Sequence, residues 1–123
     1  MAFLCLGLAA PHLARAETWT AIDGDTLRSN SGEYLRMRGL DAPESFRPHC
    51  RSEAIAAAAA TRALKALIAG KTIVILRHGR DKYGRTLGDV FVDGVNVAGV
   101  MVKAGVAKPW LGRNSNWCLT SPR

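Results

Sequence analysis

Alternating apolar and polar positions predict β-strands in the first part of the chain. Residues 19–22 form one predicted strand, and residues 26–29 and 34–40 form a predicted hairpin around a polar turn. In the second arm of this hairpin, Arg36 and Arg38 fall on the face opposite the apolar residues. The pattern therefore predicts three strands, with two arginines directed away from the core.

The second part of the chain alternates between helical and strand-like segments. Residues 52–69 are rich in alanine and free of glycine and proline, and their apolar residues recur at helical spacing. β-Branched residues predict a strand at 72–76, followed by a polar loop through Gly84 and another strand at 87–92. Asn96 is a good N-cap for a second helix.

This order of elements predicts an α+β fold that is mainly β. Five short strands, with a helix after the third and a second helix after the fifth, are typical of a small closed barrel of the OB type. Such barrels bind nucleic acids or sugars, so the fold alone does not decide the function. At 123 residues the chain is long enough for one domain with a hydrophobic core.

The first 16 residues are predicted to form a signal peptide. Residues 3–10 are apolar, and Ala14-Arg15-Ala16 has the small-x-small form of a signal-peptidase site, although no basic residue precedes the apolar run. That run is too short to span a bilayer, which takes about 20 residues. We therefore expect residues 17–123 to form a periplasmic or secreted domain without stable membrane insertion. The alternative is an apolar first strand.

The charge balance favours a polyanionic partner. The chain has 17 Lys and Arg residues against 10 Asp and Glu residues, a net charge of +7. A basic surface attracts nucleic acid through counterion release and anionic lipid through Coulomb attraction. A generic basic surface explains the same balance, so charge alone leaves both interpretations open.

Cysteine usage agrees with export. Cys5 would leave with the signal peptide, while Cys50 and Cys118 would remain, either as a disulfide or as two unrelated thiols. The three histidines of the chain do not fall at paired metal-ligand spacing with the cysteines, which argues against zinc.

Charged clusters carry the candidate chemistry. They are Asp23-Gly24-Asp25-Thr26, Arg36-Met37-Arg38-Gly39-Leu40-Asp41-Ala42-Pro43-Glu44 and Asp81-Lys82-Tyr83-Gly84-Arg85, with the basic and aromatic Lys108-Pro109-Trp110 as a fourth. Carboxylates and main-chain carbonyls are the oxygen ligands of Ca²⁺. Arginine donates paired hydrogen bonds to phosphate, and a spare carboxylate can activate water. Each cluster alone has an ordinary explanation, such as a turn; together they supply the groups for metal-dependent phosphodiester hydrolysis.

The first three clusters, in this order and at this spacing, resemble the staphylococcal nuclease (thermonuclease) family. The resemblance runs from about residue 22 to residue 108. It implies a five-stranded OB-type barrel that hydrolyses DNA and RNA with one Ca²⁺ and leaves 3′-phosphate ends. We expect no sequence specificity, because phosphate contacts carry no base information. We also expect a monomer.

The resemblance assigns the metal and phosphate ligands residue by residue. Asp25, Asp41 and the main-chain carbonyl of Ala42 would bind calcium. Many relatives have threonine in place of Ala42, a change that a carbonyl ligand tolerates. Arg36 and Arg85 would hold the scissile phosphate and neutralise its developing charge.

Further positions would act on water and substrate. Glu44 would position the attacking water or act as the general base, although a glutamate with an ordinary pKa of about 4.3 is a weak base. Lys82 and Tyr83 would contact a neighbouring phosphate, and Asp23 would lie near the metal without binding it. The paired tyrosines that flank the nucleotide in the family's type member are absent. Trp110 either stacks on the substrate in their place or merely covers the barrel.

Two other functions share part of this pattern. A non-catalytic OB-fold module would bind nucleic acid with the basic surface alone, and a structural calcium-binding protein would need the acids but not the arginines. The complete catalytic set favours the calcium-dependent nuclease. A Cys50–Cys118 disulfide would pin the tail where the family has its last C-terminal helix.

Overall fold

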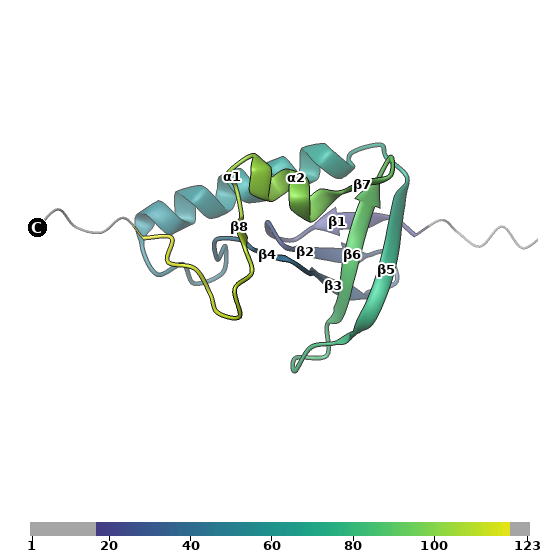
Figure 1. Cartoon of the computed structure of the whole chain (residues 1–123), viewed down its shortest axis with the longest axis horizontal. Coiled ribbons are helices and arrows are strands. Elements are labelled where there is room, and N and C mark those ends of the chain that lie inside the picture. Colours follow the sequence, from purple (N-terminus) through teal and green to yellow (C-terminus); the bar gives the residue numbers. More distant parts are fainter. Residues whose placement is uncertain (1–16, 119–123) are drawn as a thin grey trace, which may run out of the picture.

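The computed structural model describes residues 17–118, in which a β-sheet packs against two helices (Figure 1). The predicted signal peptide, residues 1–16, lies outside the described residues. None of the helices in the described part is long and apolar enough to cross a membrane. In chain order, the elements are β1 (Trp19–Ala21), β2 (Thr26–Ser29), β3 (Tyr34–Met37), β4 (Leu40–Asp41), α1 (Arg51–Ile68), β5 (Ile73–Arg80), β6 (Thr86–Val92), β7 (Val95–Asn96), α2 (Val97–Lys103) and β8 (Lys108–Pro109).

The main sheet has the strand order β1-β2-β3-β6-β5, with β7 paired to β6. Its strands run antiparallel except for β3 and β6, which are parallel. β4 and β8 form a second sheet of two strands. The mainly-β α+β class is confirmed, and the helices follow the third and fifth long strands as predicted. Between residues 17 and 118 no pairing joins β1 to β5, so the hydrogen-bond path of the expected barrel stays open.

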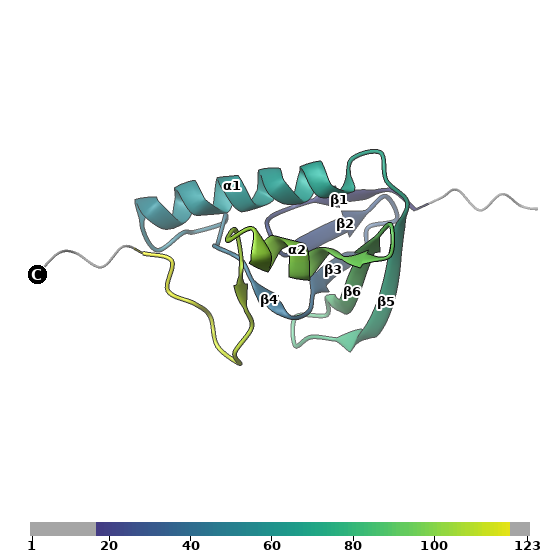
Figure 2. The same cartoon turned by 45° about the horizontal axis from the view of Figure 1, so that its top comes forward.

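The hydrophobic core lies between the sheet and the helices. α1 runs along the sheet with α2 beside it (Figure 2). Its buried face contains Ala57, Ala60, Leu64 and Ile68. Met101 of α2 is fully buried in the same cluster. Burial of a side chain as large as leucine or methionine contributes about 1.5–3 kcal/mol, so this cluster holds the helices on the sheet.

Local sequence signals are confirmed at several element ends. The side chain of Asn96 accepts a hydrogen bond from the main-chain N–H of Ala98 and caps α2. Gly70, just past α1, has a φ of 67°, a conformation that favours glycine. In β3, Leu35 and Met37 are buried while Arg36 lies on the outer face, as the alternation predicts.

β5 is longer than the sequence predicts. It continues to Arg80, so the polar loop is confined to residues 81–85. The register of β5 against β6 shifts between Arg77 and Arg80, and Gly79 has a φ of 86°. A bulge therefore lets exposed, polar residues remain in a paired strand, which hides the alternation expected of a strand.

Candidate active site

Asp25 lies in the turn between β1 and β2, and its carboxylate reaches the end of β4. The residue is only 8% exposed. Its Oδ2 accepts a hydrogen bond from the main-chain N–H of Ala42 at 3.1 Å, and its Oδ1 accepts one from the Thr26 hydroxyl at 3.0 Å. The structure thus brings Asp25 against the Asp41–Ala42 peptide. We call Asp25, Asp41, Ala42 and Glu44 the acidic centre.

Gly24 makes this close approach possible. A Cβ atom at Gly24 would lie 2.7 Å from the Cβ of Ala60 in α1 and 2.8 Å from the Cβ of Ala42. Carbon atoms in contact are about 3.5–4.0 Å apart, so only glycine fits here. The Asp23 carboxylate accepts the main-chain N–H of Asp25 at 3.1 Å and shapes the turn. Asp23 therefore acts on the backbone that carries Asp25.

Arg36 projects from β3 to the acidic centre. Its guanidinium donates to the carbonyl of Met37 at 2.7 Å and to the carbonyl of Leu40 at 3.2 Å. One terminal nitrogen lies 3.3 Å from Oδ2 of Asp25, and the side chain is 15% exposed. Two carbonyls and a carboxylate therefore fix the guanidinium beside Asp25.

The acidic centre holds more negative charge than Arg36 balances. Burial raises the pKa of Asp25 to about 6, although the charge of Arg36 opposes the rise. Burial also raises the pKa of Glu44, and the charges of Asp25, Glu53 and Asp41 raise it further. Since neighbouring carboxylates disfavour each other's charged form, a bound cation would relieve their repulsion.

A buried glutamate, which the sequence analysis did not single out, holds the loop that carries Glu44. Oε2 of Glu53 accepts the main-chain N–H of Glu44 at 3.4 Å, and Oε1 accepts the main-chain N–H of His49 at 2.6 Å. Burial raises the pKa of Glu53, but the hydrogen bonds from His49 and Glu44 outweigh it and leave the pKa lowered. Glu53 is the third residue of α1, three positions after the N-cap Cys50, which is the spacing of a capping box. This spacing is the sequence signal by which Glu53 could have been found.

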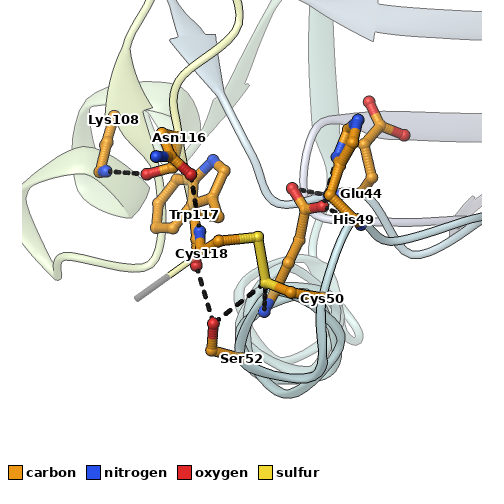
Figure 3. Close-up of a disulfide and its surroundings, with 9 residues drawn as sticks. Glu44, His49, Cys50, Ser52, Lys108, Asn116, Trp117 and Cys118 are labelled. Atoms are coloured by element: carbon orange, nitrogen blue, oxygen red, sulfur yellow. Dashed lines mark hydrogen bonds and ion pairs between the residues drawn. A yellow bond between two sulfur atoms is a disulfide. The ribbon is translucent and has the colours of Figure 1, made fainter. Parts of the chain in front are cut away.

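The C-terminal segment also reaches the acidic centre. Cys118 forms a disulfide with Cys50, with an S–S distance of 2.13 Å and a Cα–Cα distance of 5.9 Å (Figure 3). Oδ2 of Asp41 accepts the main-chain N–H of Ser115 at 2.8 Å and the indole Nε1–H of Trp117 at 3.3 Å. These partners are at least 74 positions away from Asp41, so no local pattern indicates them.

The environment of Trp110 differs from that of Trp117. Trp110 follows β8, donates its main-chain N–H to the carbonyl of Gly39 at 3.1 Å and is 45% exposed. The Nζ of Lys108 lies 4.4 Å from the ring centroid of Trp117, so this lysine pairs with Trp117 instead of the neighbouring Trp110. Contact of Trp110 with a substrate stays a prediction.

Residues 81–85, which connect β5 to β6, form the second candidate region, here called the basic turn. Oδ1 of Asp81 accepts the main-chain N–H groups of Tyr83 and Arg85 at 2.9 Å, and Oδ2 accepts Nε of Arg85 at 2.7 Å. Tyr83 is 72% exposed, and Lys82 Nζ and Arg85 Cζ lie 5.1 Å and 5.5 Å from the centroid of its ring. The turn presents two cations and an aromatic ring to solvent, which suits phosphates and bases.

The sheet connects the two regions. Parallel pairing of β3 with β6 places Arg36 opposite Leu87. Arg85 directly precedes Thr86, the first residue of β6, which pairs with Leu35 next to Arg36. The sheet therefore brings the end of the basic turn close to the strand that carries Arg36.

The donor set of the acidic centre fits a hard cation. Across residues 17–118, no three His, Cys, Asp or Glu side chains are grouped as a ready metal cage. The carboxylates of Asp25 and Asp41 and the carbonyl of Ala42 are nevertheless the oxygen donors that Ca²⁺ takes, usually together with water. Burial raises the pKa of Asp25 to about 6, and a cation bound beside it would favour its charged form.

Comparison with known proteins identifies similar sequences. Residues 34–116 match the family described as staphylococcal nuclease homologue, a range that contains the basic turn and all of the acidic centre except Asp25. An uncharacterized endonuclease of Escherichia coli is 39% identical over 90 residues, which are 70% of this chain and 54% of that protein.

Two further relatives have related names. Endonuclease YncB of Bacillus subtilis is 33% identical over 93 residues, 72% of this chain and 44% of that protein. The probable staphylococcal-like nuclease CAN1 of Oryza sativa subsp. japonica is 38% identical over 73 residues, 59% of this chain and 20% of that protein. The chain thus spans about half the length, or less, of these curated relatives.

Proposed function

Because the chain belongs to the staphylococcal nuclease homologue family, we propose that it is a calcium-dependent nuclease that hydrolyses phosphodiester bonds in DNA and RNA. The observation that carries this proposal is the meeting of three groups from different elements: the turn after β1, strand β3 and the end of β4. The main-chain N–H of Ala42, next to Asp41, donates to the carboxylate of Asp25. The guanidinium of Arg36 lies against this carboxylate of Asp25. A protein that only bound nucleic acid would not need acids and an arginine packed together in this way.

Asp25, Asp41 and the main-chain carbonyl of Ala42 would hold the calcium ion. When bound, calcium would supply positive charge that the phosphate and the acidic centre both lack. The turn formed by Asp23 and Gly24 keeps Asp25 at its place. The hydrogen bond between Asp25 and the N–H of Ala42 aligns the two main ligand segments.

Glu44 is the proposed general base. Its carboxylate takes a proton from the attacking water while the water oxygen forms a bond to phosphorus. The bond from phosphorus to the 5′ oxygen breaks, that oxygen takes a proton from solvent water, and a 3′-phosphate end remains. The raised pKa of Glu44 brings its basicity closer to neutral pH, where a general base works best.

The two arginines would stabilise the phosphate as its charge grows. Arg36 is already fixed by the carbonyls of Met37 in β3 and Leu40 in β4 and needs little rearrangement. Arg85 would exchange its contact with Asp81 for a phosphate oxygen. Lys82 and Tyr83 would contact a neighbouring phosphate, and Trp110 would offer a stacking surface.

The setting of this activity also belongs to the proposal. A disulfide between Cys50 and Cys118 supports an oxidising compartment, so we place the protein in the periplasm or outside the cell. We further propose that it acts as a monomer on nucleic acid without sequence specificity.

The test is an assay of cleavage. The purified protein is incubated with single-stranded DNA or RNA at mildly alkaline pH, first with Ca²⁺ and then with excess chelator. The proposal predicts cleavage that the chelator abolishes and products with 3′-phosphate ends. Salt-sensitive binding without cleavage would instead favour the non-catalytic nucleic-acid-binding module.

A further inference from the structure

We propose that Trp117 and Ser115, held in place by the Cys50–Cys118 disulfide, are positioning residues that orient the Asp41 carboxylate for calcium binding. The inference rests on the proposed function, because it takes Asp41 as a calcium ligand. It adds a role for the C-terminal segment, which would fix a ligand without touching the ion.

The hydrogen bonds to Asp41 define the orientation of its carboxylate. The main-chain N–H of Ser115 and the indole Nε1–H of Trp117 both donate to Oδ2, at 2.8 and 3.3 Å. Asp41 is only 4% exposed. Two donors on one oxygen restrict rotation of the carboxylate, so that the position of Oδ1 is fixed as well. Outer partners of this kind are a recurrent feature of metal sites.

The segment that carries both donors is fastened at two points. At one end, Lys108 of β8 pairs with Asp41 of β4 in the small sheet. At the other, Cys118 is bonded to Cys50, the N-cap residue of α1 (Figure 3). Residues 113–117 between these points form neither helix nor strand, so their position depends on these attachments.

Side-chain contacts then place the Trp117 ring within the segment. The Nζ of Lys108 lies 4.4 Å from the ring centroid and donates to the carbonyl of Asn116 at 3.0 Å (Figure 3). The hydroxyl of Ser52, in the first turn of α1, donates to the carbonyl of Trp117 at 3.3 Å. The indole N–H is therefore held toward Asp41 by its surroundings, and the disulfide closes this arrangement.

Calcium affinity of full-chain variants tests the proposal. Isothermal titration with CaCl₂ is applied to the wild type, to Trp117→Phe and to Trp19→Phe. Trp117→Phe keeps an aromatic ring for Lys108 but removes the donor to Asp41. We expect its calcium Kd to rise about tenfold, the lower end of effects seen for outer partners of metal ligands. Trp19, which lines a cavity with Ile68 at the far end of α1, is the matched control and should leave Kd unchanged.

The disulfide provides a second arm. The double variant Cys50→Ser/Cys118→Ser should weaken calcium binding at least as much as Trp117→Phe, because both donors lose their anchor. Adding Trp117→Phe to that double variant should then change Kd little. In the calcium-free protein, Asp41→Ala should shift the NMR resonance of the Trp117 indole N–H and leave that of Trp19 unmoved, which tests the hydrogen bond without any metal.

The outcomes separate this inference from the function on which it rests. A wild type that neither binds calcium nor needs it for cleavage overturns both. A wild type that binds calcium, with Trp117→Phe binding equally well, overturns only the positioning role. Tighter binding in the variants also overturns it, because the tail would then compete with the ion. Thermal unfolding of each variant identifies any that fail to fold. In that case the positioning role is decided by whether Asp41→Ala shifts the NMR resonance of the Trp117 indole N–H.

Discussion

The acidic centre and the basic turn are built in opposite ways. In the acidic centre, each ligand is buried and held by residues from another part of the chain, as Asp25 is held by Ala42 and Asp41 by Trp117. In the basic turn, one residue, Asp81, organises its neighbours through contacts within five positions. The first is a product of the tertiary fold, and the second is a local motif presented to solvent.

The two regions should therefore respond differently to substitution, one in both stability and activity and the other in activity alone. A buried centre can raise the pKa of a carboxylate or fix its orientation only while the fold is intact, so substitutions there should affect stability and activity together. An exposed turn can be altered with little effect on folding, and its substitutions should affect activity alone. The following predictions test this division.

Arg36 and Arg85 give the largest contrast. Arg36→Ala and Arg85→Ala should each lower the cleavage rate at least ~10²-fold, because each removes a donor to the transition state. Arg36→Ala should also destabilise the protein by about 1–3 kcal/mol, since it leaves buried acceptors unsatisfied. Arg85→Ala should cost less than about 1 kcal/mol. Urea unfolding and initial rates measure the two effects, and equal loss of stability in both variants would contradict the division.

Gly24→Ala tests the packing that carries Asp25 to Ala42. Its Cβ would overlap the Cβ atoms of Ala60 and Ala42, so we expect a loss of about 1–3 kcal/mol in urea unfolding. Gly99→Ala in α2 is the control, because nothing lies within 4 Å of the added Cβ. An exposed helical glycine replaced by alanine should leave stability unchanged or raise it by up to about 1 kcal/mol. Equal stability of the two variants would mean that the close approach at Gly24 is relaxed in solution.

Substitution of Glu33, which contacts Thr86 directly after the basic turn, should have the smallest effect on stability. Its carboxylate accepts hydrogen bonds from Arg77 at 2.7 Å and from Thr86 at 2.7 Å. Hydrogen bonding by Arg77 lowers the pKa of Glu33 to about 2, from an ordinary value of 4.5. Since the pKa is lower in the folded state, the stabilisation is complete above pH 4.5 and is lost as the pH falls toward 2.

Glu33→Gln should therefore cost less than about 1 kcal/mol at pH 7, because half of the Arg77 side chain is open to solvent. The difference from wild type should shrink between pH 4.5 and pH 2 in thermal unfolding. Glu17→Gln, which removes a 3.5 Å contact to the same arginine, is the control and should have no measurable effect. A Glu33 difference that grows on acidification would contradict this sign.

Sequence reasoning succeeded where the cause was local. The N-cap at Asn96, the alternation that turns Arg36 away from the core and the turn residues around Gly84 depend on near neighbours, and each can be read from a short window. The order of the elements along the chain and the mainly-β class follow from the succession of such windows. The same reasoning ended β5 too early, because a bulge near Gly79 removed the local pattern while pairing with β6 continued.

The supports of the acidic centre could not be predicted in this way. Glu53 was visible only as a helix residue, although its spacing from Cys50 offered a hint. Nothing local connects Trp117 to Asp41 or Gly24 to Ala60, since these contacts exist only after the chain has folded. The family resemblance gave the expected ligands, but not the residues that hold them.

The most direct test of the account compares the calcium requirement of one variant from each region. Initial cleavage rates of wild type, Asp41→Asn and Arg85→Ala are measured across a calcium titration buffered by chelator. Asp41→Asn should need at least about tenfold more calcium for half-maximal rate, because it removes the charge of a proposed calcium ligand. Arg85→Ala should lose maximal rate at an unchanged calcium midpoint. Cleavage that persists in excess chelator, or an Asp41→Asn midpoint equal to that of wild type, would contradict the account.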